Sequence, residues 1–176
     1  DAMNGVHKAV VNEGIGGNTV TANVNPAPSS MPGIDRLERD VLKHSGVTHV
    51  VLFMGTNDIR REATAAQVIA GIQEIINRVH AEEIKIIGAT IIPRHDRAPT
   101  ENNTGWTPAK TATRNEVNNW IRTDAPFDGV LDFDLMVQDS ENPNLIESSF
   151  NCDGIHPNPR GYYEMGSNVN LNLFKD

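Results

Sequence analysis

Two apolar segments separated by one amphipathic helix constrain the fold of this chain more than any other feature. Thr48–Met54 and Ile84–Ile92 are apolar on both faces, as expected of strands buried in a parallel sheet. Between them, Thr64 and Gln67 form a capping-box pattern in front of an apolar stripe with helical spacing. Parallel strands need a long crossover, usually a helix, so this succession predicts a β-α-β unit.

The alternation of strands and helices continues on both sides of this unit. The other predicted elements are a strand at Lys8–Val11, a helix carrying Ile34 to Leu42, a helix that starts at Thr107 with Pro108 in its first position, a strand at Gly129–Asp134, a long loop to Pro157, and a final helix from Asn158. Strands separated by helices predict parallel pairing and helices on both faces of the sheet. We therefore expect residues 1–176 to form a single α/β domain, a three-layer α/β/α sandwich.

Charge and hydropathy exclude some partners. The formal net charge is −8, so binding to a phosphate backbone is not expected. The longest apolar run, Val50 to Met54, is too short to span a bilayer. Cys152 is the only cysteine, either a reduced thiol or half of a disulfide, and it does not fix the compartment. The chain opens abruptly at Asp1–Asn4 without a signal peptide, so both secretion and a cytoplasmic location stay open.

An acid and a histidine three positions apart lie in the loop before the last helix. In Asp153-Gly-Ile-His156-Pro, the carboxylate can hold one imidazole N–H and leave the other ring nitrogen as a general base. The alternative is an Asx turn beside a surface histidine. Metal binding is not expected, because no further ligands occur at suitable spacing.

Two other segments fall at the carboxyl ends of predicted strands, where sites form in parallel sheets. Gly55-Thr-Asn57-Asp58 follows the most apolar strand, so the Asn57 amide could donate to a developing oxyanion, or simply end the strand in a turn. Asn12–Asn18 contains three glycines. Such a turn could cradle a phosphate or offer one backbone N–H to an oxyanion. We expect both segments to lie near Asp153 and His156.

In this order, the three motifs resemble blocks two, three and five of the SGNH (GDSL-type) esterases and lipases. The resemblance implies a flavodoxin-like fold with five parallel strands and hydrolysis of esters without metal or cofactor. It also implies that the Gly17 N–H and the Asn57 amide bind the oxyanion, that His156 is the general base, and that Asp153 orients it. The substrate would be a small acyl ester, such as an acetylated carbohydrate.

Two more residues are expected at the substrate. Asn18 completes the glycine-rich segment. Trp106 ends the polar loop that starts at Arg94, and it could stack on a sugar or pack within its own loop.

The sequence departs from the family pattern in lacking the Gly-Asp-Ser block that supplies the nucleophile. The serines are Ser29, Ser30, Ser45, Ser140, Ser148, Ser149 and Ser167. None occupies the strand-to-turn setting of a nucleophile, and Ser148 and Ser149 are expected to make local backbone hydrogen bonds. The resemblance therefore predicts a serine on a segment upstream of this chain. The alternative is a non-catalytic or weakly active domain that binds acyl or glycan ligands.

The same absence affects the fold. In the family the first strand lies between the second and third, so its loss leaves backbone groups of two central strands unpaired, at roughly 1–3 kcal/mol for each dry group. We therefore expect a domain that lacks its first strand and helix, with the missing part supplied by an upstream segment or another polypeptide. Closing of the gap or strand exchange in an oligomer is the alternative.

Overall fold

The computed structural model describes residues 8–101 and 103–175. The strands are β1 (His49–Leu52), β2 (Lys85–Ala89) and β3 (Gly129–Leu131), and the helices are α1 (Gly33–Leu37), α2 (Thr56–Arg60), α3 (Ala65–Ala81), α4 (Pro108–Thr123), α5 (Phe133–Val137) and α6 (Pro159–Ser167). A π-helical turn, Glu38–Leu42, extends α1, and a 3₁₀ turn, Leu171–Phe174, follows α6. None of the helices in these ranges is long and apolar enough to cross a membrane.

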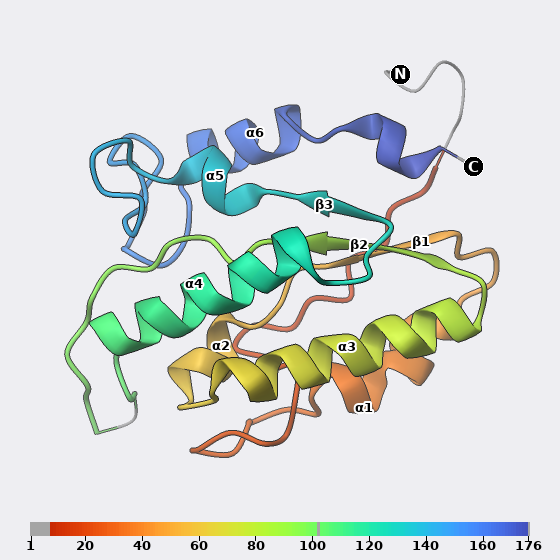
Figure 1. Ribbon diagram of the computed structural model, residues 1–176, viewed down its shortest axis with the longest axis horizontal. Helices are drawn as coiled ribbons and strands as arrows, with labels where there is room; N and C mark the ends of the chain where they lie inside the picture. Colours follow the sequence, from red (N-terminus) through yellow and green to blue (C-terminus); the bar gives the residue numbers. More distant parts are fainter. Residues whose placement is uncertain (1–7, 102, 176) are drawn as a thin grey trace.

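The three strands form a parallel sheet in the order β1-β2-β3 (Figure 1). In the register, Val50 is paired with Ile86, and Ile87 with Gly129. α3 is the crossover from β1 to β2, and α4 connects β2 to β3. The predicted β-α-β organisation is thereby confirmed.

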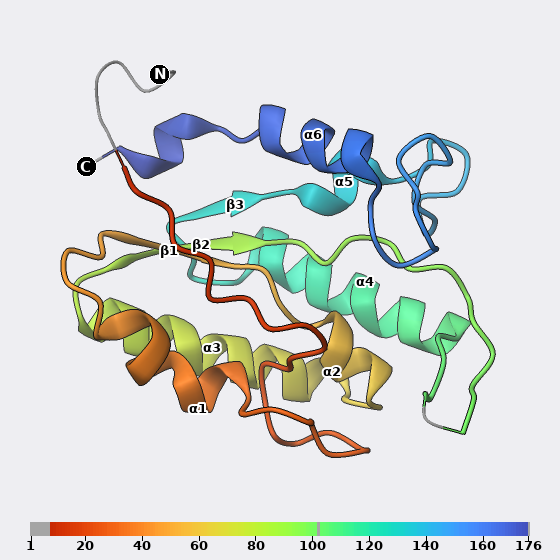
Figure 2. The same cartoon turned by 180° about the vertical axis from the view of Figure 1, so that it is seen from behind.

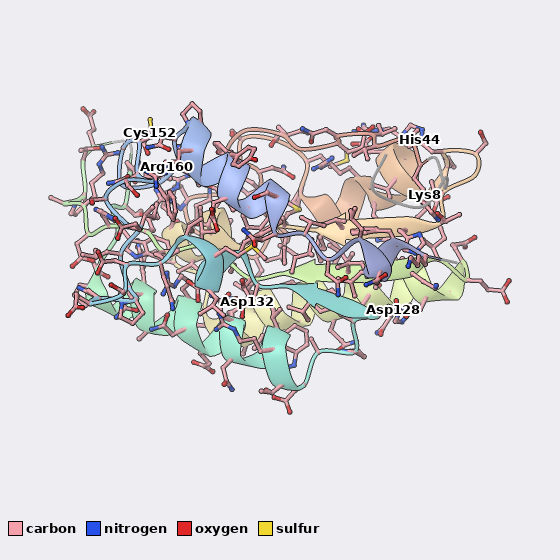
Figure 3. The ribbon with its side chains drawn as sticks, turned by 90° about the horizontal axis from the view of Figure 1, so that it is seen from above. Lys8, His44, Asp128, Asp132, Cys152 and Arg160 are labelled. Atoms are coloured by element: carbon pink, nitrogen blue, oxygen red, sulfur yellow. The ribbon has the colours of Figure 1, made fainter. Side chains whose placement is uncertain are left out.

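Helices lie on both faces of the sheet. Figure 3, viewed from above, shows α3 and α4 on one side of the strands and α1 and α6 on the other. The side of α3 and α4 holds the larger core, with Val68, Ile72 and Ile76 of α3 almost fully buried. On the opposite side, the C-terminal 3₁₀ turn packs Leu173 and Phe174 against the β2–β3 part of the sheet. The three-layer α/β/α architecture is confirmed.

The helix starts follow the sequence signals. The Thr64 hydroxyl accepts from the backbone N–H of Gln67, and the Gln67 side chain accepts from the Thr64 N–H, which completes the capping box of α3. The Thr107 hydroxyl caps α4 by accepting from the backbone N–H of Lys110, without a reciprocal bond, and Pro108 stands at the first helical position. Asn158 caps α6 through its side-chain oxygen.

A buried asparagine on α4 holds the backbone that follows β2 at the carboxyl edge of the sheet. The Asn118 side chain accepts from the backbone N–H of Ile91 and donates to the Ile91 carbonyl, both over 2.8 Å. These bonds satisfy the buried N–H and carbonyl of Ile91, which lies just past the end of β2 and outside its pairing with β3. The loop that follows, from Pro93, is thereby fixed to α4.

Two expectations about strands were wrong. Lys8–Val11 is irregular, and Val10 is 94% exposed. A strand needs a ladder of backbone hydrogen bonds, and residues 9–11 form none with the described residues, although the Lys8 side chain lies 3.2 Å from the Thr48 hydroxyl. In Figure 2 this segment (red) crosses β1 rather than running along it. The predicted strand segment Thr48–Met54, which contains β1, is also not buried on both faces, because Val51 and Phe53 are 44% and 42% exposed.

The C-terminal half differs in a smaller way. The strand predicted to reach Asp134 ends at Leu131, since the Asp132 side chain accepts from the Leu135 N–H and begins α5. The loop expected up to Pro157 therefore contains a short helix.

The described residues place no further strand beyond β1. The family's first strand was expected at the outer edge of β1. The exposed side chains of Val51 and Phe53 belong to this part of the chain. The abrupt opening at Asp1–Asn4 lies outside the described residues.

Candidate active site

Asp153 and His156 form a hydrogen-bonded pair. The His156 Nδ1 lies 2.9 Å from the Asp153 Oδ2, and the Asp153 Oδ1 also accepts from the backbone N–H groups of Ile155 and His156. These bonds, chiefly the one to the His156 ring, hold the pKa of Asp153 well below its usual range. The Asx turn and the acid–imidazole pair were alternatives in the sequence, and the structure contains both. The turn positions the carboxylate beside the imidazole ring.

The other ring nitrogen of His156 faces outward. The side chain is 62% exposed, and no described residue lies within hydrogen-bonding distance of Nε2. An imidazole whose Nδ1 is held by a carboxylate presents Nε2 as a proton acceptor, which is the arrangement of a general base.

The loop of this pair is fixed to the segment that follows β2. The backbone N–H of His95 donates to the Gly154 carbonyl over 2.8 Å. Gly154 has φ = +79°, and a Cβ there would approach the His95 side chain to 3.1 Å, so a residue with a side chain would be strained. Asn158 supports the loop from the other side by donating to the carbonyls of Ser149 and Asn151.

The glycine-rich segment and the segment after β1 lie together. The Asn57 Nδ2 donates to the Asn18 carbonyl over 3.1 Å, and the amide has a second N–H left to donate. Gly17, which has φ = +73°, is exposed, and its N–H has no acceptor among the described residues. The structure thus brings two predicted oxyanion donors to neighbouring positions. Asn57 lies in the first turn of α2, a short helix that the sequence analysis did not predict.

Asp58 locks these two segments to each other. Its fully buried carboxylate accepts from the backbone N–H groups of Val20 and Thr21. Burial raises the pKa of Asp58 to about 6, although both backbone hydrogen bonds oppose the rise. The sequence motif contained Asp58, but its structural role was not predicted.

Asn18 is buried and its side chain is fully engaged. Its Nδ2 donates to the Ser30 hydroxyl and to the Met31 carbonyl, and its Oδ1 accepts from the Arg36 guanidinium. These contacts hold the proline-rich loop beside the glycine-rich segment. Both N–H groups of the Asn18 amide are therefore used within the protein, and the Asn18 backbone carbonyl accepts from the Asn57 amide.

Trp106 is buried within its own loop. Its Nε1 donates to the Thr111 hydroxyl over 2.9 Å, and the guanidinium of Arg94 lies over its ring, 5.0 Å from the centroid. One face of the ring is thus covered by a protein cation. Arg94 itself was not singled out from the sequence beyond being the start of a polar loop.

No serine hydroxyl hydrogen-bonds to His156, although all seven serines lie in the described part of the chain. Ser148 donates to the Glu147 carboxylate, and the Ser30 hydroxyl accepts from Asn18. The Ser149 backbone N–H donates to the same carboxylate, so among the described residues neither hydroxyl makes the expected bond to the backbone.

Among the described residues, no three histidine, cysteine, aspartate or glutamate side chains gather as metal ligands. A cavity of about 330 Å³ is lined by Arg94 and Asp96 together with residues of α4 and of the loop after α5. His156 is not part of its lining. The loop after β2 and the loop after α5 lie beyond the carboxyl ends of the strands (Figure 1).

Solved structures share this architecture. A GDSL-like lipase of Bacteroides thetaiotaomicron superposes with a TM-score of 0.61 at 19% identity, covering 80% of this chain and 68% of that one. A Streptococcus pneumonia protein provisionally named a platelet activating factor gives a TM-score of 0.73 at 18% identity, covering 97% and 75%. A provisionally named acylhydrolase of Bacteroides fragilis gives 0.63 at 20% identity, covering 80% and 67%. These likenesses establish the fold.

No curated protein matches the chain. The sequence profile of the GDSL-like Lipase/Acylhydrolase family matches residues 2–163, which include all three motifs. The chain therefore belongs to the GDSL-like lipase/acylhydrolase family.

Proposed function

We propose that this chain carries the acid–base and oxyanion parts of an ester hydrolase that acts on small acyl esters. The observation that carries the proposal is the 2.9 Å pair of Asp153 and His156 with the opposite ring nitrogen of His156 open to a substrate. Membership of a lipase and acylhydrolase family favours esters as the substrate class.

In the proposed reaction, His156 takes a proton from the attacking serine and returns it to the leaving alcohol. Asp153 keeps Nδ1 protonated and stabilises the imidazolium that forms. The Gly17 N–H and the Asn57 amide donate to the oxyanion of the tetrahedral intermediate, where one such bond contributes roughly 3–4 kcal/mol. Water then releases the acyl group from the serine.

The serine is proposed to come from a segment that pairs with the outer edge of β1. The exposed Val51 and Phe53 offer an apolar face to such a segment. A strand there would end at the same edge of the sheet as Asn57 and His156, because the ends of parallel strands coincide.

Organophosphate labelling of the native protein, followed by peptide mapping and an intact mass, tests this assignment. Label on a serine outside the present 176 residues, in a protein heavier than 19.3 kDa, is the expected result. Hydrolysis of p-nitrophenyl acetate without any label would exclude serine chemistry.

The role of His156 is tested by the same assay on His156→Ala. The matched control is His80→Ala, because His80 forms a similar surface pair with Asp128 over 3.0 Å. We expect a loss of activity in the first variant and none in the second. Equal activity of wild type and His156→Ala would reject His156 as the base.

A domain that binds acyl or glycan ligands without turnover is the second candidate, favoured by the absence of a serine bonded to His156 among the seven in this chain. It predicts ligand binding by the native protein with hydrolysis no faster in wild type than in His156→Ala.

A further inference from the structure

Arg94 differs from every other buried cation in the described part of the chain. Five basic side chains are buried, and Arg94, only 6% exposed, has no ion pair and a single long hydrogen bond of 3.5 Å to the Thr56 hydroxyl. The other four are Arg36, Arg61, Lys110 and Arg114, each with at least two acceptors within 3.3 Å. A guanidinium has five N–H donors, so most of those on Arg94 have no protein acceptor.

The Arg94 nitrogens that lack a protein acceptor are not fully enclosed, so they stay accessible to solvent or to a ligand. The surroundings nonetheless hold Arg94 in place and add to the positive potential. The guanidinium lies over the Trp106 ring, and the hydrogen bond from the Trp106 Nε1 to Thr111 fixes that ring. Burial, with the neighbouring charges of Arg60 and Arg97, lowers the pKa of Arg94 to about 10, while the charge of Asp153 opposes this shift, so Arg94 is still protonated at neutral pH.

Arg94 lies between the parts of the candidate active site. Its one hydrogen bond goes to Thr56, the residue before Asn57. The next residue along the chain, His95, donates to the carbonyl of Gly154 in the loop that carries Asp153 and His156.

The guanidinium also borders the 330 Å³ cavity. That cavity is otherwise lined by neutral polar groups such as Asn115 and Asn142, together with apolar carbon and one carboxylate, Asp96. Asp96 is exposed and forms no ion pair with Arg94, and the acid whose charge acts on the guanidinium is Asp153 of the candidate active site. The volume is within the range of small-molecule sites.

We propose that Arg94 binds a carboxylate on the ester substrate, and that the enzyme acts on anionic rather than neutral esters. A planar carboxylate matches the planar fork of a guanidinium and can accept two parallel hydrogen bonds. The cavity then receives the ring or chain that bears the carboxylate, while the ester bond reaches His156. This assignment rests on the proposed function and adds a substrate class to it.

A matched pair of esters tests the assignment. 4-Acetoxybenzoate and its methyl ester present the same acetyl group, and only the first carries a carboxylate at neutral pH. The measured quantity is the ratio of kcat/KM for the anionic ester to that for the neutral ester, in the native protein and in Arg94→Gln. We expect the ratio to fall about tenfold or more in the variant, because a charge-assisted pair is lost. Arg94→Lys, which keeps the charge without the fork, is expected to fall between the two.

The matched control is Arg160→Gln. Arg160 also lies over an aromatic ring, that of Phe150 at 5.6 Å, but it is exposed. The ratio should be unchanged in this variant. An unchanged ratio in a folded Arg94→Gln protein, or an equal fall in Arg160→Gln, overturns the assignment.

A binding measurement separates failure of this inference from failure of the proposed function. If neither ester is hydrolysed, the proposed function fails, and calorimetric titration with benzoate and methyl benzoate decides on Arg94. Tighter binding of benzoate that disappears in Arg94→Gln supports the carboxylate site. Equal affinity in wild type and variant overturns it.

Discussion

The carboxylate of Asp58 accepts a hydrogen bond from the backbone N–H of Val20 over 2.9 Å, joining segments 38 residues apart in sequence. With a second bond from Thr21, it fixes the glycine-rich segment against the start of α2. The relative placement of Gly17 and Asn57 therefore depends on a buried acid whose pKa burial raises to about 6.

This raised pKa predicts a pH dependence of stability. Between pH about 4 and about 6, the folded state binds more protons at Asp58 than the unfolded state does, so the free energy of unfolding falls as the pH rises. The contribution is greatest below pH about 4 and is lost by about pH 6, with a total of about 3 kcal/mol. Urea unfolding of wild type and Asp58→Asn across this window measures it. A parallel pH dependence in the two proteins would contradict the prediction.

Replacing Asp153 by Asn is expected to disturb the imidazole without unfolding the loop. Asn can still accept backbone N–H bonds, but its amide cannot stabilise an imidazolium or hold Nδ1–H as a carboxylate does. We expect kcat to fall by roughly two to four orders of magnitude, in line with the trypsin triad. Nitrogen NMR of the His156 ring should show a mixture of tautomers in the variant. Asp128→Asn, in the surface pair with His80, is the control and should leave activity intact.

Gly55→Ala is expected to destabilise the fold by roughly 2–4 kcal/mol. Gly55 has φ = +118°, and a Cβ there would lie 2.7 Å from the Ile91 Cδ1. Thermal unfolding compares this variant with Gly166→Ala, where a Cβ meets nothing within 4 Å. Gly166 lies in α6, so alanine there should be neutral or slightly stabilising. Equal unfolding temperatures in the two variants would show that position 55 accepts a Cβ without strain.

Asn118→Ala removes the hydrogen-bond partners of two backbone groups, the N–H and the carbonyl of buried Ile91. Leaving these groups dry and unpaired should cost roughly 2–4 kcal/mol, whereas Asn119→Ala at the neighbouring exposed position should cost little. Chemical denaturation measures both. Hydrogen exchange of the Ile91 amide should also accelerate selectively in the first variant, and unchanged exchange would argue against the role given to Asn118.

Local signals in the sequence predicted the helix starts well. The boundaries at Thr64 and Thr107 follow from side chains that bond to their own helix, so distant residues are not needed to place them. The pairing of Asp153 with His156 is equally local, since both lie in one turn.

Other features depend on residues far away in the sequence. Whether Lys8–Val11 becomes a strand, or whether Val51 is buried, is decided by what lies beside β1, which the segments themselves do not encode. The sequence did not indicate that Arg94 is buried with only one long hydrogen bond, because this depends on which distant residues surround it.

The uncovered edge of β1 also has a consequence for handling the protein. Unpaired peptide groups beside exposed Val51 and Phe53 form a template onto which a second molecule can add in register. Concentrated samples of these 176 residues, without the proposed serine-bearing strand on this edge, are therefore expected to self-associate through intermolecular β-bridges.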